Sequence, residues 1–216
     1  MLNPDTVLQP DTLAKLVERA EAHPRAGITA PRLVYPDGSL QYSARRFPTI
    51  TAAIFRNTFL GRLFPNAAAA SRYVMADWDH DEEREVDWVS GACLMIRREA
   101  WEQVGELDEG FVWGSEDVDY CYRMHAAGWG VRFTPAITVV HAVGRSTDQA
   151  VVPTIVRTHR GMYRLYRKHF APSPLAWPPV WLGVWIRAGL LILSWETRRM
   201  LNRIWRTVGR GRAWRR

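Results

Sequence analysis

The chain has 216 residues, of which 47% are hydrophobic and 24% charged, and it contains 15 glycines and 13 prolines, a composition that excludes disordered, collagen-like and low-complexity chains. Residues 1–150 hold 15 Lys or Arg against 21 Asp or Glu, a net charge of −6, whereas residues 151–216 hold 14 against 1, a net charge of +13. This asymmetry predicts an acidic body with a basic tail that meets a polyanion, either a membrane surface or a nucleic acid.

The N-terminal part is predicted to contain a helix followed by a hairpin. Asp11 precedes apolar residues at helical spacing, so a helix is expected over about 11–22. Residues 28–35 form a predicted strand, and the Pro-Asp-Gly-Ser turn at 36–39 leads into a second extended piece over 40–43.

Targeting and cysteine content are also informative. The first residues lack the charged and apolar regions of a secretory signal, so a cytoplasmic location is expected. Cys93 and Cys121 are too few for a disulfide framework or a four-cysteine zinc site, which indicates two buried thiols in a reducing compartment.

An acidic segment invites a calcium-binding interpretation because Asp77, Asp79 and Asp81 alternate like the first ligands of an EF-hand loop. The sixth position of such a loop requires Gly and the twelfth a bidentate Glu, but Glu82 and Trp88 occupy them. We therefore expect a solvated loop.

Residues 86–126 contain several candidate functional residues close together in the sequence. A strand ending at two arginines precedes a short helix over 99–105 with Gly105 as its stop. A second helix is expected to begin near Ser115, which places Glu116 and Asp117 in its first turn, where the helix dipole stabilises negative charge. Helix capping and surface charge remain the alternative interpretation of these carboxylates.

The next segment delivers a histidine to the end of a strand. Two short apolar strands, 131–133 and 137–140, are separated by Pro135, and His141 follows the second. A lone histidine here is compatible with a structural role. Together with Asp5, it places functional groups at element ends, where α/β proteins build their sites.

Seven motifs, taken in order, resemble those of family 2 glycosyltransferases, especially the bacterial rhamnosyltransferase-like branch, over residues 1 to about 170. They are Leu2-Asn3-Pro4-Asp5, Pro36-Asp37-Gly38-Ser39-Leu40-Gln41, Val89-Ser90-Gly91-Ala92, Leu107-Asp108-Glu109, Glu116-Asp117-Val118-Asp119, Ala127-Gly128-Trp129 and Val139-Val140-His141.

The resemblance implies an α/β fold of the GT-A type, a mixed sheet with flanking helices that binds a nucleotide-sugar and a divalent cation. By this resemblance, Asp5 is a carboxylate ligand of Mg²⁺ or Mn²⁺, and His141 helps to bind the metal or the diphosphate. Asp117 matches the general base that deprotonates the acceptor hydroxyl, and Glu116 is expected to orient or tune it.

The acceptor is expected to contact Trp113, which can stack on a sugar ring, and Asp119. Family members carry, before the Asn3-Pro4-Asp5 motif, the first strands of the sheet and the acidic residue that reads the nucleotide base. This chain is expected to be N-terminally truncated relative to them, with sheet edges left unpaired. Donor-binding residues are therefore not assigned.

The tail, residues 171–216, is predicted to be a basic, Trp-rich helix that follows a partial GT-A domain over 1–170. Segment 175–195 is long enough to span a bilayer, but Arg187 lies near its middle, at a cost of roughly 2.5–3.5 kcal/mol, and both flanks are basic. We expect an amphipathic helix in the interface at the cytoplasmic face of the cell membrane, bound to anionic lipid. A single transmembrane helix within 175–195, or a helix packed on the body, is the alternative.

The expected function is inverting transfer of a sugar, with rhamnose favoured, from dTDP-rhamnose or a UDP-sugar to a polyprenyl-linked or cell-envelope glycan acceptor. The alternative is a catalytically inactive, truncated remnant that acts as a membrane-binding or subunit-like module. Nucleic-acid binding is not expected, because no reading motif accompanies the basic tail.

Overall fold

The computed structural model describes residues 1–49, 68–142, 150–170 and 173–212, and the chain divides into two compact units, Met1–Ala150 and Val151–Arg216. The division lies before the boundary expected at residue 170, because the helix that follows Ala150 packs against the C-terminal helix. It coincides with the change from acidic to basic composition.

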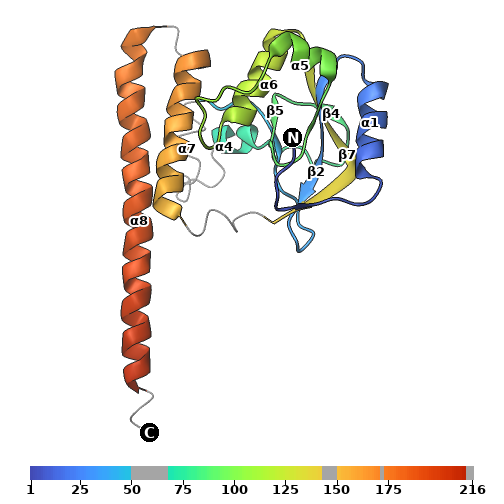
Figure 1. Cartoon of the computed structure of the whole chain (residues 1–216). Helices are drawn as coiled ribbons and strands as arrows, with labels where there is room; N and C mark the ends of the chain where they lie inside the picture. Colours follow the sequence, from blue (N-terminus) through green and yellow to red (C-terminus); the bar gives the residue numbers. More distant parts are fainter. Residues whose placement is uncertain (50–67, 143–149, 171–172, 213–216) are drawn as a thin grey trace. The chain divides into compact units, whose positions relative to one another are not determined.

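The first unit is built on a mixed sheet, shown in Figure 1. Its strands are β1 (Thr6–Val7), β2 (Ala26–Val34), β4 (Arg84–Glu85), β6 (Met95–Ile96) and β7 (Gly130–His141). The order is β1-β7-β2-β6, and β4 also pairs with β7. Only β2 and β7 are parallel; the other pairs are antiparallel. A second sheet pairs β3 (Ala44–Arg45) with β5 (Trp88–Val89).

Strand β7 joins the two strands expected on either side of Pro135 into one element with an irregular register. Pro31 of β2 is opposite Thr134, but the next residue, Arg32, is opposite Thr138. Three residues of β7 therefore bulge out between these pairs. Pro135 is one of them, and a residue without a backbone N–H is tolerated at such a bulge.

Helices flank the main sheet: α1 (Thr12–Ala22) lies on one side, and α5 (Arg98–Val104) and α6 (Glu116–Ala126) lie on the other (Figure 1). A further short helix, α4, covers Ala68–Tyr73. The apolar side of α1 contributes Leu16, which is 2% exposed, to the core under the sheet. Full burial of such a side chain stabilises the fold by about 1.5–3 kcal/mol. One buried core cluster consists of Leu16, Leu33, Ala92, Cys93, Ile137 and Val139.

Most predicted elements of this unit are confirmed. Helix α1 begins directly after Asp11, α5 ends directly before Gly105, and α6 begins directly after Ser115. The turn at 36–39 returns the chain onto β2, although the second extended piece forms only a single bridge, Val34 to Leu40. Both cysteines are free and buried. In the acidic segment, Asp81 pairs with Arg32 at 2.6 Å.

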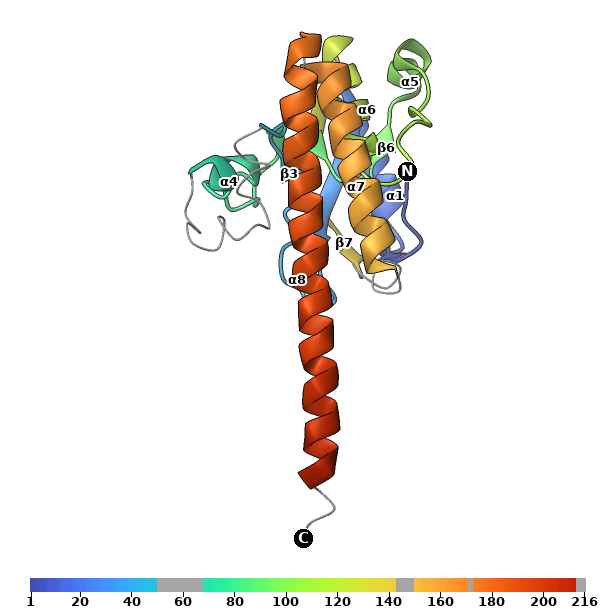
Figure 2. The same ribbon diagram turned by 90° about the vertical axis from the view of Figure 1, so that its left-hand side faces the viewer.

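The second unit consists mainly of two helices that lie side by side, α7 (Val151–Leu165) and α8 (Trp177–Arg212), as Figures 1 and 2 show. A π-helical turn, Tyr166–Phe170, and a 3₁₀ turn, Pro174–Ala176, occur between them. The helical segment Pro174–Asn202, which comprises the 3₁₀ turn and the first part of α8, is long and apolar enough to cross a membrane, by length and composition only. Only 6% of its most apolar stretch is buried.

Arg187 of α8 contacts α7 through a histidine. Its Nη1 lies 2.6 Å from Nε2 of His159, whose Nδ1 lies 2.7 Å from the carbonyl oxygen of Ile155. A carbonyl oxygen only accepts, so Nδ1 carries the proton and Nε2 accepts from the arginine. Burial lowers the pKa of His159, which favours this neutral form.

Candidate active site

The first part of the candidate site forms where β1 meets the end of β7. Thr6 pairs with His141, and the Ala142 N–H donates to the Asp5 carbonyl oxygen at 2.9 Å. This pairing places Nε2 of His141 3.3 Å from the Asp5 Oδ1 atom. The structure thus brings together the two predicted metal ligands, which are far apart in the sequence.

The opposite edge of the His141 ring faces Gln41. Its Oε1 atom lies 3.0 Å from Nδ1 of His141, and its Nε2 donates to the His141 carbonyl oxygen at 2.6 Å. Gln41 belongs to the Pro-Asp-Gly-Ser-Leu-Gln motif, but no local pattern indicates this contact and we predicted no role for Gln41. The partners are separated by 100 positions.

The second part of the site is the start of α6. Ser115 lies in the left-handed region at φ 77°, directly after Gly114 at φ 75°. This sharp turn into the helix costs Ser115 about 1–2 kcal/mol relative to ordinary backbone. It sets Glu116 and Asp117 at the first turn, as predicted.

The Asp117 carboxylate is held by two backbone N–H groups. Gly91 donates to Oδ2 at 3.0 Å and Val118 to Oδ1 at 2.9 Å. Burial raises the pKa of Asp117, and these hydrogen bonds and the charge of Arg45 oppose the rise without cancelling it. The group therefore binds a proton more readily than an exposed aspartate does.

Glu116 is half-buried beside it. Burial raises the pKa of Glu116 above its ordinary value, and the neighbouring Asp117 charge adds to the rise. Its buried Oε2 atom finds no hydrogen-bond partner among the described residues. Two adjacent carboxyls with raised pKa values are typical of sites that transfer protons.

One short segment connects the two parts of the site. Gly91 bonds to the Asp117 carboxylate, and the carbonyl oxygen of the next residue, Ala92, accepts from the Asn3 N–H at 2.8 Å. A Cβ atom on Gly91 would lie 2.6 Å from the Met1 Cε atom, whereas its 3.4 Å distance to the Asp117 Cβ would be an ordinary contact. The Asn-Pro-Asp motif and the start of α6 are therefore fixed to the same piece of backbone.

The two predicted acceptor-binding residues differ in accessibility. Trp113 lies before α6 with 41% of its surface exposed, which is compatible with stacking on a sugar. Asp119 is 0% exposed, and its Oδ2 pairs with Nε of Arg123 at 3.0 Å. This geometry does not support the acceptor contact predicted for Asp119, because its carboxylate is fully enclosed; the contact stays a prediction.

Asp119 instead belongs to a structural network. Its partner Arg123 also donates to the carbonyl oxygens of Val104 at 2.9 Å and Glu106 at 2.7 Å. The network fastens α6 to the end of α5. The spacing of Asp119 and Arg123, four residues apart on one helix, is a signal in the sequence that could have indicated this pair.

The side chains of Asp5 and His141 are of the types that donate electron pairs to a divalent cation. A carboxylate oxygen and an imidazole nitrogen are acceptable ligands for Mn²⁺ and Mg²⁺, which prefer oxygen. Among the residues that the structure describes, no group of three His, Cys, Asp or Glu side chains could hold a metal. A cation here would take its remaining ligands from phosphate oxygens and water, as Mg²⁺ commonly does in phosphate-handling sites.

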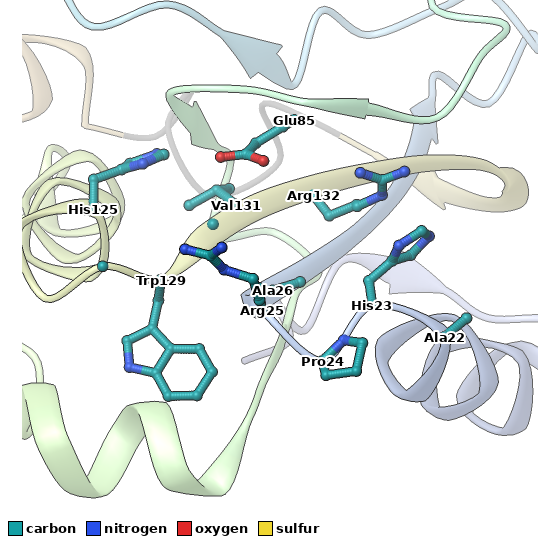
Figure 3. A pocket seen from close by; sticks show the side chains of 12 residues that line it. Ala22, His23, Pro24, Arg25, Ala26, Glu85, His125, Trp129, Val131 and Arg132 are labelled. Carbon is teal, nitrogen blue, oxygen red and sulfur yellow. The ribbon is translucent and has the colours of Figure 1, made fainter.

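A cavity of about 620 Å³ lies at the end of β2 and β7 where these strands begin, away from Asp5 and His141 (Figure 3). Its lining includes Ala26 and Gly130, the paired first residues of β2 and β7. None of the predicted site residues lines it. We place the candidate active site at the Asp5 and Asp117 end, because the convergent titratable groups lie there.

Comparison with known proteins gives three findings. Residues 1–162 match the family model described as glycosyltransferase like family 2. N-acetylglucosaminyl-diphospho-decaprenol L-rhamnosyltransferase of Mycobacterium tuberculosis (strain H37Rv) is 34% identical over 161 residues, which are 74% of this chain and 52% of that protein. Rhamnosyltransferase WbbL of Escherichia coli K12 is 28% identical over 141 residues, 65% of this chain and 50% of that protein.

The chain thus spans about half the length of these curated relatives. Among solved structures, GalNAc-T7 with UDP, GalNAc and Mn²⁺ is similar at a TM-score of 0.44 and 16% identity, over 75% of this chain and 30% of that one.

Proposed function

The chain belongs to glycosyltransferase family 2, and on this premise we propose that it supplies the general base and the cation ligands of an inverting sugar transfer. The observation that carries the proposal is the shared backbone segment at Gly91 and Ala92, which is bonded both to the Asp117 carboxylate and to the motif that contains Asp5.

Asp117 is the proposed general base. It accepts the proton of the acceptor hydroxyl while that oxygen forms a bond to the anomeric carbon, and the bond from this carbon to the nucleoside diphosphate breaks on the opposite face. The configuration at the carbon is thereby inverted. The raised pKa of Asp117 favours proton uptake, which suits a general base.

Four other side chains support this chemistry. Glu116 lies beside the base, and the charge of Asp117 raises the pKa of Glu116. Asp5 and His141 would hold Mg²⁺ or Mn²⁺, and a bound cation stabilises the charge that develops on the departing diphosphate. Trp113 offers an exposed aromatic face for the acceptor sugar.

The substrates are proposed from the names of the relatives. One is a rhamnosyltransferase that acts on N-acetylglucosaminyl-diphospho-decaprenol, and the other is also called a rhamnosyltransferase. We infer rhamnose, with dTDP-rhamnose ahead of a UDP-sugar as donor, and a polyprenyl-linked or cell-envelope glycan as acceptor.

A lipid-linked acceptor fits the proposed location at the cytoplasmic face of the membrane. Exposed apolar side chains on α8 include Trp181, Ile186 and Leu190. Arg187 turns toward His159 of α7, which partly offsets the cost of placing this arginine in an apolar layer. The basic flanks still favour a helix that lies in the interface over one that spans the bilayer.

The function can be tested in a chimera. The matching segment of the Mycobacterium tuberculosis relative would be replaced by residues 1–162 of this chain, and rhamnosyl transfer from dTDP-rhamnose to its lipid acceptor would be measured. We expect transfer, and Asp117→Asn should lower turnover by about a hundredfold or more while donor binding persists.

Glu109→Gln provides the matched control, because Glu109 is exposed in the same loop region and should leave turnover unchanged. A folded chimera whose Asp117→Asn variant turns over at the unmodified rate would remove Asp117 from the role of base.

A further inference from the structure

The orientation of the Gln41 side-chain amide is fixed by its surroundings. Gln41 is 7% exposed. Its Nε2 donates to two backbone carbonyl oxygens, that of His141 at 2.6 Å and that of Val34 at 3.3 Å. Carbonyl oxygens only accept hydrogen bonds, so rotating the amide by 180° would bring its oxygen against two acceptors. The nitrogen therefore occupies this position, and Oε1 points to the histidine ring.

This orientation decides which ring nitrogen of His141 carries hydrogen. Oε1 of Gln41 lies 3.0 Å from Nδ1 of His141, and an amide oxygen can only accept. Nδ1 must therefore donate. In the neutral imidazole the lone pair is then on Nε2, the atom that faces Asp5 Oδ1 at 3.3 Å.

A lone pair that faces a carboxylate oxygen needs a proton or another positive group between the two. A divalent cation meets that requirement, since metal-ligating histidines commonly donate their other N–H to a partner that fixes the tautomer. We propose that Gln41 is a positioning residue that holds His141 in the Nδ1–H form, so that Nε2 and the Asp5 carboxylate together present a ligand pair to a divalent cation. The inference rests on the proposed function for the cation itself.

A purely structural role for Gln41 would also use the hydrogen bond to the His141 carbonyl oxygen, which fastens the segment after the 36–39 turn to the end of β7. The two roles differ in what they imply for the ring. A structural role leaves the position of the ring proton open, whereas positioning requires it on Nδ1. The tautomer is therefore the discriminating measurement.

The first test reads the tautomer directly. Ring nitrogen chemical shifts of the full chain, labelled with ¹⁵N-histidine in detergent micelles, would be recorded at a pH where the ring is neutral, with His141→Gln used for assignment. We expect Nδ1–H for His141 in the unmodified chain. An Nε2–H tautomer there overturns the proposal without any need for a Gln41 variant to fold.

The second test changes Gln41. Gln41→Met keeps the side-chain length but cannot accept from Nδ1, so His141 should shift toward the Nε2–H form and donate to Asp5. Gln9→Met is the matched control on an exposed glutamine. An unchanged tautomer in a folded Gln41→Met chain overturns the proposal.

The third test uses Mn²⁺ as the probe, with electron paramagnetic resonance titration of the full chain in the presence of dTDP. Loss of a partner that orients a metal-ligating histidine typically weakens metal binding by about 10–100-fold, and we expect this for Gln41→Met but not for Gln9→Met. Asp5→Ala should weaken binding as well.

Failure of this inference is distinguishable from failure of the proposed function. If the unmodified chain shows the Nδ1–H form but binds no Mn²⁺, Gln41 does not act toward a cation and the inference is overturned. Base catalysis by Asp117 is measured separately, through the turnover of the chimera, and is not decided by that result.

Discussion

Asp117 and Asp119 lie two positions apart in α6, but their carboxylates meet different surroundings. Asp117 bonds only to backbone N–H groups in the contacts described above and keeps partial exposure. Asp119 is fully enclosed and faces the guanidinium of Arg123. The first environment leaves a carboxyl available for proton transfer, whereas the second neutralises it within the fold. Two acidic residues of one motif thus differ in environment, and we propose a chemical role only for Asp117.

Asp119→Ala is expected to destabilise the first unit. Removing one partner of a buried ion pair leaves the other charge uncompensated, which typically costs about 3–5 kcal/mol. The free energy of unfolding, measured by urea titration of the full chain, should fall by about this amount. Asp119→Ala combined with Arg123→Met should recover part of the loss. Unchanged stability combined with weaker acceptor binding would show that Asp119 contacts the acceptor after all.

The raised pKa values of Glu116 and Asp117 predict a pH dependence of stability. Both groups bind protons more readily in the folded chain than in the unfolded chain, where ordinary values of 4.5 and 3.8 apply. Protonation therefore favours the folded state. The stabilising contribution is complete below the ordinary values and is lost as pH rises through the raised ones.

Urea unfolding between about pH 4 and pH 8 measures this dependence. Relative to the unmodified chain, Glu116→Gln with Asp117→Asn should gain stability toward the upper end, because neutral side chains avoid the cost of burying charge. Parallel pH profiles for the two proteins would show that these carboxyls keep ordinary pKa values.

At the scale of elements, the sequence predicted helices better than contacts. Helices α1 and α6 begin directly after Asp11 and Ser115, as expected, because residue type and apolar spacing at a helix start are local signals, although neither side chain makes a capping hydrogen bond. The bulge at Pro135 was seen only as a break between two strands. The register that joins them depends on pairing with β2, a partner about a hundred residues away in sequence that no local pattern specifies.

The candidate site shows the same limit. Asp5, His141 and Asp117 were identified through motif order, and the structure brings the first two together. Gln41 belongs to one of the quoted motifs, but no role was predicted for it. Its contact with His141 exists only after β7 pairs with β2. The burial of Asp119 was likewise a property of packing between α5 and α6, which composition does not reveal.

The contact between α7 and α8 gives a prediction for His159. His159→Ala removes the acceptor of Arg187 and leaves a partly buried guanidinium group without that partner, which should destabilise the helix pair by about 1–3 kcal/mol. Amide hydrogen exchange in α7 of the full chain should accelerate accordingly. Arg160→Ala, at an exposed neighbouring position, is the control and should leave exchange unchanged.

At the scale of the whole molecule, charge and architecture divide at the same place. The acidic first unit carries the candidate active site, and the second unit carries a net charge of +13 and the exposed apolar face of α8. Both properties of the second unit favour an anionic membrane surface, where each nearby basic residue contributes about 1 kcal/mol.

Membrane binding of the full chain should therefore combine two forces. Vesicle flotation should show tighter binding to anionic than to neutral lipid, and high salt should weaken it without abolishing it, because salt screens charge and not apolar burial. A chain ending at residue 171 should remain in solution. Resistance of the intact chain to extraction by alkaline carbonate would show instead that α8 spans the bilayer.

The long separation between paired strands also determines when the candidate active site can form during synthesis. Gln41 and His141 are 100 positions apart, so at roughly 5–20 residues per second the histidine emerges roughly 5–20 s after its partner. Until then β2 lacks its parallel neighbour, and its apolar side chains are open to aggregation or chaperones. The basic helix is synthesised after the first unit, so that unit can fold before membrane attachment begins.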